Sequence, residues 1–346
     1  MKKKSTTKTI KKIVLISGFI ICSFLVGIVV LNFVYMSGSI DFYKPELTAF
    51  NSGNDLSDGN DKDTILIMGD SFTAGNSYVD ILRYMYPHYR IINSGISGTG
   101  IIQADIIGKK RTKRFKPKVF IYQIYAGNDL FDITYPVNWK NISFARNLYW
   151  SIANNVRVVA YMNYRYTTMR NLKNITYKEY KPSNAHYIND EKFSVQRYKK
   201  IYKIYNRADD ELIEDSILLK GKKKEDFDIL VARLNELLDE LLVDCNKAIV
   251  VVPHMAQLSK VYLDRTVQLG AAFSEPDKAL AVDYPFLRQL REQFPDVFII
   301  NPLMALRKAE EEGIEVYYTD NVHFNMNGNK VLAESIASYL KDQTIH

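Results

Sequence analysis

The chain has 346 residues, of which 47% are hydrophobic and 25% are charged, as expected for one large or two small globular domains. The formal net charge of +7 includes six lysines among the first twelve residues, so the remainder of the chain is close to neutral. The charge therefore does not support a nucleic-acid-binding function. Only two cysteines are present, Cys22 and Cys245, and this number excludes a cysteine-based metal site.

Residues 13–36 form a stretch of 24 residues without a charged side chain. At a rise of about 1.5 Å per residue, a helix of this length crosses a hydrocarbon core of about 30 Å. A cleaved signal peptide is the alternative, but residues 36–39 match an Ala-x-Ala-like cleavage site poorly. We therefore predict a cytoplasmic basic tail over residues 1–12, an uncleaved signal anchor over 13–36 and an extracytoplasmic location for the rest. Because Cys22 falls in the membrane span, the exported part has no internal disulfide.

Residues 37–63 are rich in Ser, Gly, Asn and Asp and are predicted to be a flexible linker to a domain over residues 64–346. In that domain, apolar runs of strand character alternate with segments of helix length, which predicts an α/β fold with a doubly wound parallel sheet. The five predicted strands cover residues 64–68, 90–93, 118–124, 247–252 and 297–300. Leucine spacing predicts a helix over 227–245, and a helix over 328–340 closes the domain.

A long insert, about residues 130–225, separates the third predicted strand from the fourth. It contains Trp139, Trp150 and many tyrosines, and a connection of this length is either a subdomain or a functional loop system. Because it leaves from the carboxyl end of the third strand, we expect it to overhang that edge of the sheet. Its aromatic rings could stack on sugar rings or could form the small core of a cap.

A basic run at residues 109–118 precedes the third strand and is therefore expected at the amino ends of the strands. The anchor is expected to reach the sheet from the same side, through the first strand. The run could then face anionic lipid headgroups while the opposite edge of the sheet looks outward. Alternatively, it is a solvated helix end and loop.

The first strand stops at Gly69, and Ser71 follows at once on the turn into a helix-like segment. Ligands of α/β proteins collect at this carboxyl edge of the sheet, and the start of the next helix is electropositive. The position suits a nucleophile whose attack creates an oxyanion. Taken alone, however, Gly-Asp-Ser is better explained by an Asp or Ser that caps the following helix.

Three later stretches accompany this turn and lie after the second strand, after the third strand and before the last helix: residues 93–100, 126–129 and 320–323. Together with the turn they resemble the four sequence blocks of the SGNH/GDSL hydrolase superfamily, in the family's order. The resemblance covers about residues 64–339. In the third block, Ala126 stands where the family has Gly, which bears on the turn rather than on the chemistry.

The resemblance implies a five-stranded flavodoxin-like SGNH fold and the activity of a serine hydrolase. It makes Ser71 the nucleophile, His323 the base that takes its proton, and Asp320 the carboxylate that orients the imidazole. Without the other blocks, Asp-x-x-His before a helix would equally well be a capping Asp followed by a surface His.

The same resemblance implies an oxyanion hole, which must place hydrogen-bond donors where charge develops on the carbonyl oxygen. Its donors would be the Ser71 backbone N–H, the Gly98 backbone N–H and the Asn128 side chain. Gly95 is the competing glycine, and Gly98 is preferred because it matches the family's small-x-Gly pattern. These glycines could instead serve turns that require a positive φ.

Asp70 and Asp129 are expected to support these turns through backbone hydrogen bonds. His254 follows the fourth strand at the same edge and either lines the pocket or is a loop histidine with its hydrogen bonds satisfied. We find no metal-ligand spacing, no phosphate-binding glycine loop and no nucleotide fingerprint, so no cofactor and no metal are predicted.

These inferences predict a membrane-anchored SGNH-type serine esterase that removes ester groups, with O-acetyl groups of a cell-surface glycan as the expected substrate class. An acyl group on Ser71 could instead pass to a sugar hydroxyl, as in exported O-acyltransferases that modify polysaccharides. The alternative of another class is a glycan-binding module on an inactive hydrolase fold. The residues leave the acyl group, the alcohol and the oligomeric state open.

Overall fold

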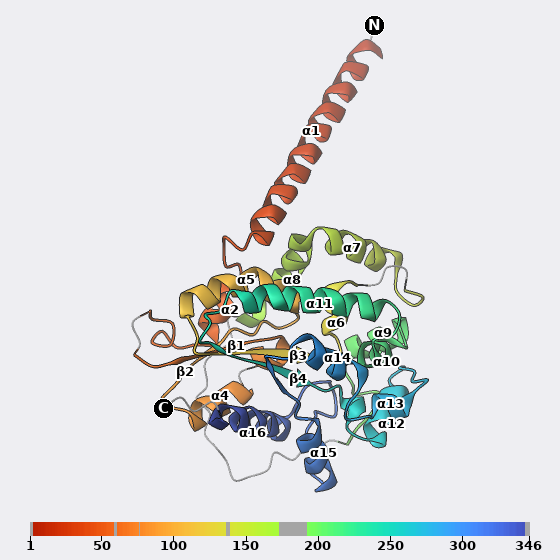
Figure 1. The fold of residues 1–346 in the computed structure, drawn as a ribbon. Helices are drawn as coiled ribbons and strands as arrows, with labels where there is room; N and C mark the ends of the chain where they lie inside the picture. Colours follow the sequence, from red (N-terminus) through yellow and green to blue (C-terminus); the bar gives the residue numbers. More distant parts are fainter. Residues whose placement is uncertain (1–2, 59–60, 76, 136–138, 173–191, 343–346) are drawn as a thin grey trace.

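A five-stranded, wholly parallel sheet with strand order β2-β1-β3-β4-β5 forms the centre of the computed structural model (Figure 1). The structure describes residues 3–58, 61–75, 77–135, 139–172 and 192–342. The strands are β1 (Thr64–Met68), β2 (Arg90–Asn93), β3 (Val119–Tyr125), β4 (Asn246–Val252) and β5 (Phe298–Ile300). Each lies within one residue of its predicted bounds, and the predicted doubly wound α/β fold is confirmed.

The strands were recognisable because the central ones are covered on both faces. Every residue of β1 and β3 is buried, and a strand of this kind is a continuous apolar run rather than an alternating one. Register places Met68 beside Tyr122 and Tyr125 beside Val252. The carboxyl ends of β1, β3 and β4 therefore meet at one edge.

Helices cover both faces of the sheet, with α5 against α11 on one face and α4 against α16 on the other (Figure 1). The helices of the described residues are α1 (Lys3–Met36), α2 (Lys44–Ala49), α3 (Ser71–Ala74), α4 (Ser77–Met85), α5 (Ile101–Phe115), α6 (Asp129–Ile133), α7 (Phe144–Asn155), α8 (Arg157–Leu172), α9 (Lys200–Ala208), α10 (Leu212–Leu218), α11 (Lys222–Asp239), the 3₁₀ helix η1 (Met255–Gln257), α12 (Lys260–Gln268), α13 (Pro276–Ala279), α14 (Pro285–Gln293), α15 (Leu303–Glu311) and α16 (Met326–Asp342).

Strand order reverses direction between β1 and β3, because the chain first moves outward to β2 and then returns past β1. Such a switch point leaves a crevice at the carboxyl ends of the two strands, which is where open α/β sheets bind ligands. Ser71 follows β1 and Asn128 follows β3, so the topology alone brings these two sequence blocks to one place.

Helix α1 projects away from the body of the protein (Figure 1). Its segment Ile10–Met36 is 27 residues long and apolar enough to cross a membrane, and no residue of its most apolar part is buried. A signal sequence has the same length and composition, so this finding establishes a possible membrane span and no topology.

The predicted flexible linker is wrong for most of its length, because residues 37–58 fold onto the domain. Helix α2 buries Glu46, whose carboxylate forms an ion pair with Arg165 of α8 at 2.5 Å. Asn51 is 4% exposed, and its amide donates to the Asn93 backbone oxygen of β2 at 2.9 Å. A polar composition resembles that of a linker, but here the polar groups are ordered by specific partners.

We expected the anchor to reach the sheet from the amino ends of the strands. This prediction is wrong. The last turn of the anchor packs against α8 of the insert, and Lys110 of α5 donates to the Ser39 backbone oxygen at 2.7 Å. The basic run is also partly neutralised: Lys113 pairs with Glu240 at 2.7 Å, and Lys118 pairs with Asp244 at 2.7 Å. Its contact with lipid headgroups stays a hypothesis.

Candidate active site

Ser71 is the first residue of α3, directly beyond the carboxyl end of β1. Asp70 is the N-cap of this short helix and accepts the Phe72 backbone N–H at 2.8 Å. Gln123 of β3, which the sequence gave no reason to select, accepts the Asp70 backbone N–H at 3.2 Å and the Thr73 hydroxyl at 2.9 Å. The serine turn is therefore fixed from both its own helix and the neighbouring strand.

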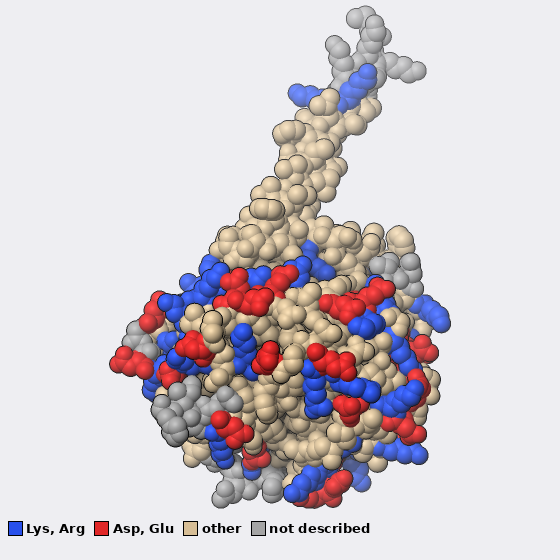
Figure 2. Space-filling model, viewed as in Figure 1, with Lys and Arg blue, Asp and Glu red and all other residues tan. Residues whose placement is uncertain are grey.

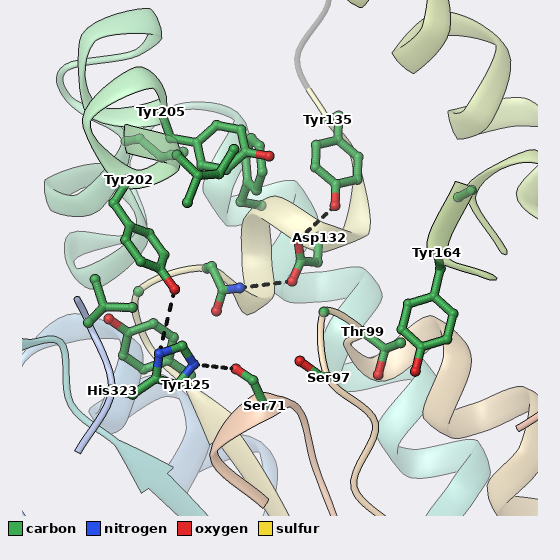
Figure 3. Close-up of a pocket in the computed structure, with 18 of the residues that line it drawn as sticks. Ser71, Ser97, Thr99, Tyr125, Asp132, Tyr135, Tyr164, Tyr202, Tyr205 and His323 are labelled. Carbon is green, nitrogen blue, oxygen red and sulfur yellow. Dashed lines mark hydrogen bonds between the residues drawn. The ribbon is translucent and has the colours of Figure 1, made fainter. Parts of the chain in front are cut away.

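His323 lies on the loop before α16, and its imidazole meets Ser71 across 252 positions of sequence. Ser71 Oγ lies 2.8 Å from His323 Nε2, the geometry in which the hydroxyl donates to an unprotonated ring nitrogen (Figure 3). The Phe72 ring lies 5.0 Å from the imidazole and packs against it. The structure thus places the predicted nucleophile and base within hydrogen-bonding distance.

The second nitrogen of His323 contacts Asn321 and, at 3.5 Å, the Tyr202 hydroxyl, rather than Asp320 (Figure 3). The Asn321 Oδ1 atom lies 3.0 Å from His323 Nδ1 and also accepts the His323 backbone N–H at 3.0 Å. The Asn321 amide nitrogen in turn donates to the Asp320 carboxylate. The predicted direct contact between Asp320 and His323 is therefore not present in this structure. The local turn places the Asn321 amide between the two side chains.

Gly98 belongs to the second sequence block, residues 93–100. It lines the cavity beside Ser71 and has a φ of +71°. A Cβ atom at Gly98 would meet no neighbour, so the positive φ is what favours glycine there. Gly95 differs, because a Cβ atom would approach Thr73 Cβ within 2.7 Å, and it therefore serves close backbone packing. The assignment of the Gly98 backbone N–H as an oxyanion donor stays a prediction.

Asn128 precedes α6 and also lines the cavity. Its Nδ2 donates to Asp132 Oδ2 at 3.0 Å, and Asp132 Oδ1 accepts the Tyr135 hydroxyl at 2.9 Å (Figure 3). Asn128 Oδ1 is buried and has no hydrogen-bond partner among the described residues. One amide hydrogen is therefore held by Asp132, which leaves the second for a substrate oxygen. Asp132 was not selected from the sequence, although its i,i+4 spacing from Asn128 was visible.

A cavity of about 430 Å³ opens over Ser71 and extends beneath the insert. Figure 3 shows the ring of side chains around it: Thr99 and Tyr164 on one side, Tyr202 and Tyr205 on the other, and Asp132 and Tyr135 between them. Tyr135 stacks on Trp150 with ring centroids 3.5 Å apart. The insert's aromatic residues therefore act both as the core of a cap and as the wall of the cavity. Its residues 136–138 and 173–191 lie outside the described part of the chain.

No family model and no curated protein matches the sequence. Solved structures similar to the chain include an acylhydrolase of Bacteroides fragilis (11% identity, 88% of this chain and 97% of that chain covered, TM-score 0.41). Others are a GDSL-like lipase of Bacteroides thetaiotaomicron (10%, 88% and 98%, TM-score 0.39) and an acetylxylan esterase of Geobacillus stearothermophilus, as a catalytic mutant (12%, 82% and 95%, TM-score 0.37). The chain has the SGNH hydrolase fold. Its strand order is the flavodoxin-like order, and one cavity is lined by a residue from each of the four blocks: Ser71, Gly98, Asn128 and His323.

Burial lowers the pKa of His323 to about 4, and the nearby Lys199 cation acts in the same direction while Asp320 opposes it. Desolvation disfavours the charged imidazolium, so the neutral form persists to acidic pH. Only the neutral imidazole can accept the Ser71 proton.

We expect the acid limb of the pH–activity profile to lie well below the ordinary histidine value of 6.5 and to approach pH 4. Activity is lost as pH falls through the folded-state pKa, because the base is then protonated. Initial rates of hydrolysis of a soluble short-chain ester between pH 3.5 and 8, fitted as kcat/KM, measure this limb. A half-point at or above 6.5 would contradict the buried, neutral histidine described above.

Asp70 and Asp129 are buried beside the turns that follow β1 and β3, and Asp132 is half-buried at the wall of the cavity. Burial raises the pKa of Asp70 and of Asp132 to about 7, and burial together with the neighbouring Asp70 raises the pKa of Asp129 well above its ordinary value. Asp129 accepts the Tyr125 backbone N–H at 3.0 Å. Asp70 and Asp129 thus bond to turn backbone, and Asp132 bonds to side chains that face the cavity.

His254 lines the same cavity, but its Nδ1 accepts the Ala256 backbone N–H at 3.1 Å and so caps η1. Burial lowers its pKa to about 3, and it is therefore a neutral structural group. Within the described ranges, no group of three or more His, Cys, Asp or Glu side chains could hold a metal ion.

Proposed function

We propose that the protein is a serine esterase whose catalytic domain acts outside the cytoplasm and forms an acyl-enzyme on Ser71. The observation that carries this proposal is the 2.8 Å contact between Ser71 Oγ and the neutral His323 Nε2 at the floor of a cavity. A serine hydroxyl is a weak nucleophile until such a base takes its proton.

The reaction follows from this arrangement. Ser71 Oγ attacks the ester carbonyl carbon as its proton passes to His323 Nε2, and the carbonyl oxygen becomes an oxyanion held by the Ser71 and Gly98 backbone N–H groups and Asn128 Nδ2. Collapse of the tetrahedral intermediate breaks the bond to the alcohol oxygen, which takes the proton from His323. Water then repeats the sequence on the acyl-Ser71 ester and releases the acid.

The proposed substrate is an ester, with acetyl groups on a cell-surface glycan as the substrate class. The cavity supports this class because it combines aromatic faces, such as those of Tyr135 and Trp150, with hydroxyl and carboxyl groups. Aromatic rings stack on the apolar faces of sugars, and polar groups bind their hydroxyls.

The proposal includes a retained membrane anchor, with the amino-terminal lysines in the cytoplasm. Tyr35 near the end of α1 is 1% exposed, its hydroxyl bonds to that of Tyr43 at 2.9 Å, and its ring lies 5.4 Å from that of Tyr161. Cleavage after residue 36 would remove Tyr35 from this cluster and expose its partners. These contacts favour an anchor that stays attached.

An O-acyltransferase with the same site is the second candidate. The insert places Tyr202 and Tyr205 over Ser71 and encloses part of the cavity, which would limit the access of water to an acyl-enzyme. Ester turnover that rises in the presence of an oligosaccharide acceptor, with acylated oligosaccharide as product, would favour the transferase over the esterase.

Labelling with a fluorophosphonate tests the shared first step. Wild-type protein is expected to be labelled and Ser71→Ala is expected to lose all labelling, because only the activated hydroxyl attacks phosphorus. Ser97→Ala is the matched control, since Ser97 lines the same cavity but, among the described residues, forms no hydrogen bond with a histidine. If correctly folded wild type is not labelled, the protein is instead an inactive binding module on this fold.

A further inference from the structure

Helix α7 of the insert has an apolar face on each side. Trp150 and Ala153 point inward and are 6% and 1% exposed. Phe144, Leu148 and Ile152, spaced at i, i+4 and i+8, lie on the outer side and are 81%, 49% and 46% exposed. Residues at this spacing form one stripe along a helix. A stripe of three large apolar side chains exposed in this way is a candidate contact surface.

The position of α7 is fixed relative to the anchor. Helix α7 packs against α8, and α8 packs against α1 (Figure 1). The Val158 backbone N–H at the start of α8 donates to Asn32 Oδ1 of α1 at 3.0 Å. Tyr35 and Tyr161 add a ring contact at 5.4 Å. The insert is therefore attached to the last turns of α1, and α7 moves with it.

The anchor is longer than a bilayer core requires. The 27 residues of Ile10–Met36 span about 40 Å at about 1.5 Å per residue, whereas the hydrocarbon core is about 30 Å thick. Lys11 and Lys12 belong with the inner headgroups, so about 20 residues from Ile13 fill the core and the end of α1, from about Asn32 to Tyr35, extends into the outer headgroup region. Because α8 contacts this end of α1, the membrane surface reaches the level of α8 and α7.

The lack of charged residues around the stripe also fits contact with a lipid bilayer. The sequence of α7 contains no Asp or Glu, and its single cation, Arg146, lies 5.0 Å from the Trp150 ring centroid and so points away from the outer stripe. Figure 2 shows the surface over α7 largely without charged residues and continuous with the uncharged base of α1. A helix of this kind buries its apolar side chains at the boundary between headgroups and acyl chains.

We infer that the outer face of α7, formed by Phe144, Leu148 and Ile152, docks into the outer surface of the lipid bilayer that α1 crosses. The inner face of the same helix lines the Ser71 cavity through Tyr149, Trp150 and Ala153. The cavity and the membrane are thus separated by the thickness of one helix, and the site faces substrates held at the membrane surface. The inference requires a retained α1 but does not depend on the chemistry of Ser71.

Site-specific fluorescence quenching in nanodiscs tests this docking surface. Full-length protein carrying Cys22→Ser and Leu148→Cys is labelled with an environment-sensitive fluorophore and reconstituted in phosphatidylcholine and phosphatidylglycerol. Met304→Cys is the matched control, because Met304 is 55% exposed on α15, on the side of the body away from α1 (Figure 1). We expect iodide to quench the label at position 148 several-fold less than the label at 304, and doxyl lipid to quench only the former.

The native Cys22 separates failure of this inference from failure of the anchor. Cys22 lies mid-way along α1 and is exposed, whereas Cys245 is buried, so wild-type protein is labelled at Cys22. Lipid quenching at Cys22 with free iodide access at position 148 would overturn the docking of α7 and leave the anchor intact. Protection of position 148 from iodide without lipid quenching would also overturn it, since another protein copy would then cover the stripe.

Discussion

His323→Ala is expected to lower kcat about 10⁴- to 10⁶-fold, because among the described residues His323 is the base within hydrogen-bonding distance of Ser71 Oγ. His254, the other histidine at the cavity, is committed to a backbone N–H and stays neutral. The measurement is steady-state hydrolysis of a soluble ester, with thermal unfolding as the control that the variant is folded. A loss below tenfold would contradict the assignment of the base.

The same kinetic measurement on variants of Asn321 and Asp320 shows which side chain orients the imidazole of His323. With Asn321 Oδ1 accepting Nδ1–H, the ring keeps the tautomer whose Nε2 is free to accept the serine proton. Asp320 holds the Asn321 amide so that its oxygen, and not its nitrogen, faces the imidazole. We therefore expect Asn321→Ala to cost about 10²-fold in kcat, and Asp320→Ala about tenfold.

Asn321→Asp is the variant that tests most directly whether Asn321, rather than Asp320, orients the imidazole. It places a carboxylate beside Nδ1, so activity is expected to be retained and Asp320 to become dispensable in the double variant. If Asp320→Ala is instead the more damaging change and Asn321→Ala is tolerated, the direct aspartate–histidine pair predicted from the sequence is the working arrangement.

The sheet and the meeting of the four blocks were accessible from sequence for a physical reason. Residues 65–68 and 248–252 had to be apolar throughout, because helices cover both sides of a parallel sheet, and such runs are conspicuous. Once the strands were placed, the carboxyl-edge rule put Ser71 and Asn128 together without knowledge of any distance.

Features that depend on one side chain finding another were not accessible. Asn321 and Asp320 are adjacent polar residues, and only the turn geometry decides which of them contacts the imidazole. Residues 37–58 have the composition of a linker, and their order comes from partners far away in sequence, such as Arg165 for Glu46. Composition describes what a segment can do in isolation, whereas these contacts belong to the folded chain.

Asn128→Ala is expected to lower kcat about 10²- to 10³-fold while leaving KM nearly unchanged, because the amide acts on charge that develops only in the transition state. Asp132 holds one hydrogen of that amide at 3.0 Å, and the Tyr135 hydroxyl fixes Asp132 from the other side. Asp132→Ala should therefore produce a smaller loss of the same kind, about tenfold in kcat.

Pre-steady-state and steady-state kinetics on one soluble ester measure both variants, and Tyr135→Phe is the conservative control because it removes the hydroxyl and keeps the ring stacked on Trp150. The kcat loss should follow the order Asn128→Ala, Asp132→Ala, Tyr135→Phe, since each change lies one hydrogen bond further from the oxyanion. An effect of Asn128→Ala on KM alone would mean that the amide binds the ground state, and the oxyanion hole would then have to be sought among the backbone donors of Ser71 and Gly98.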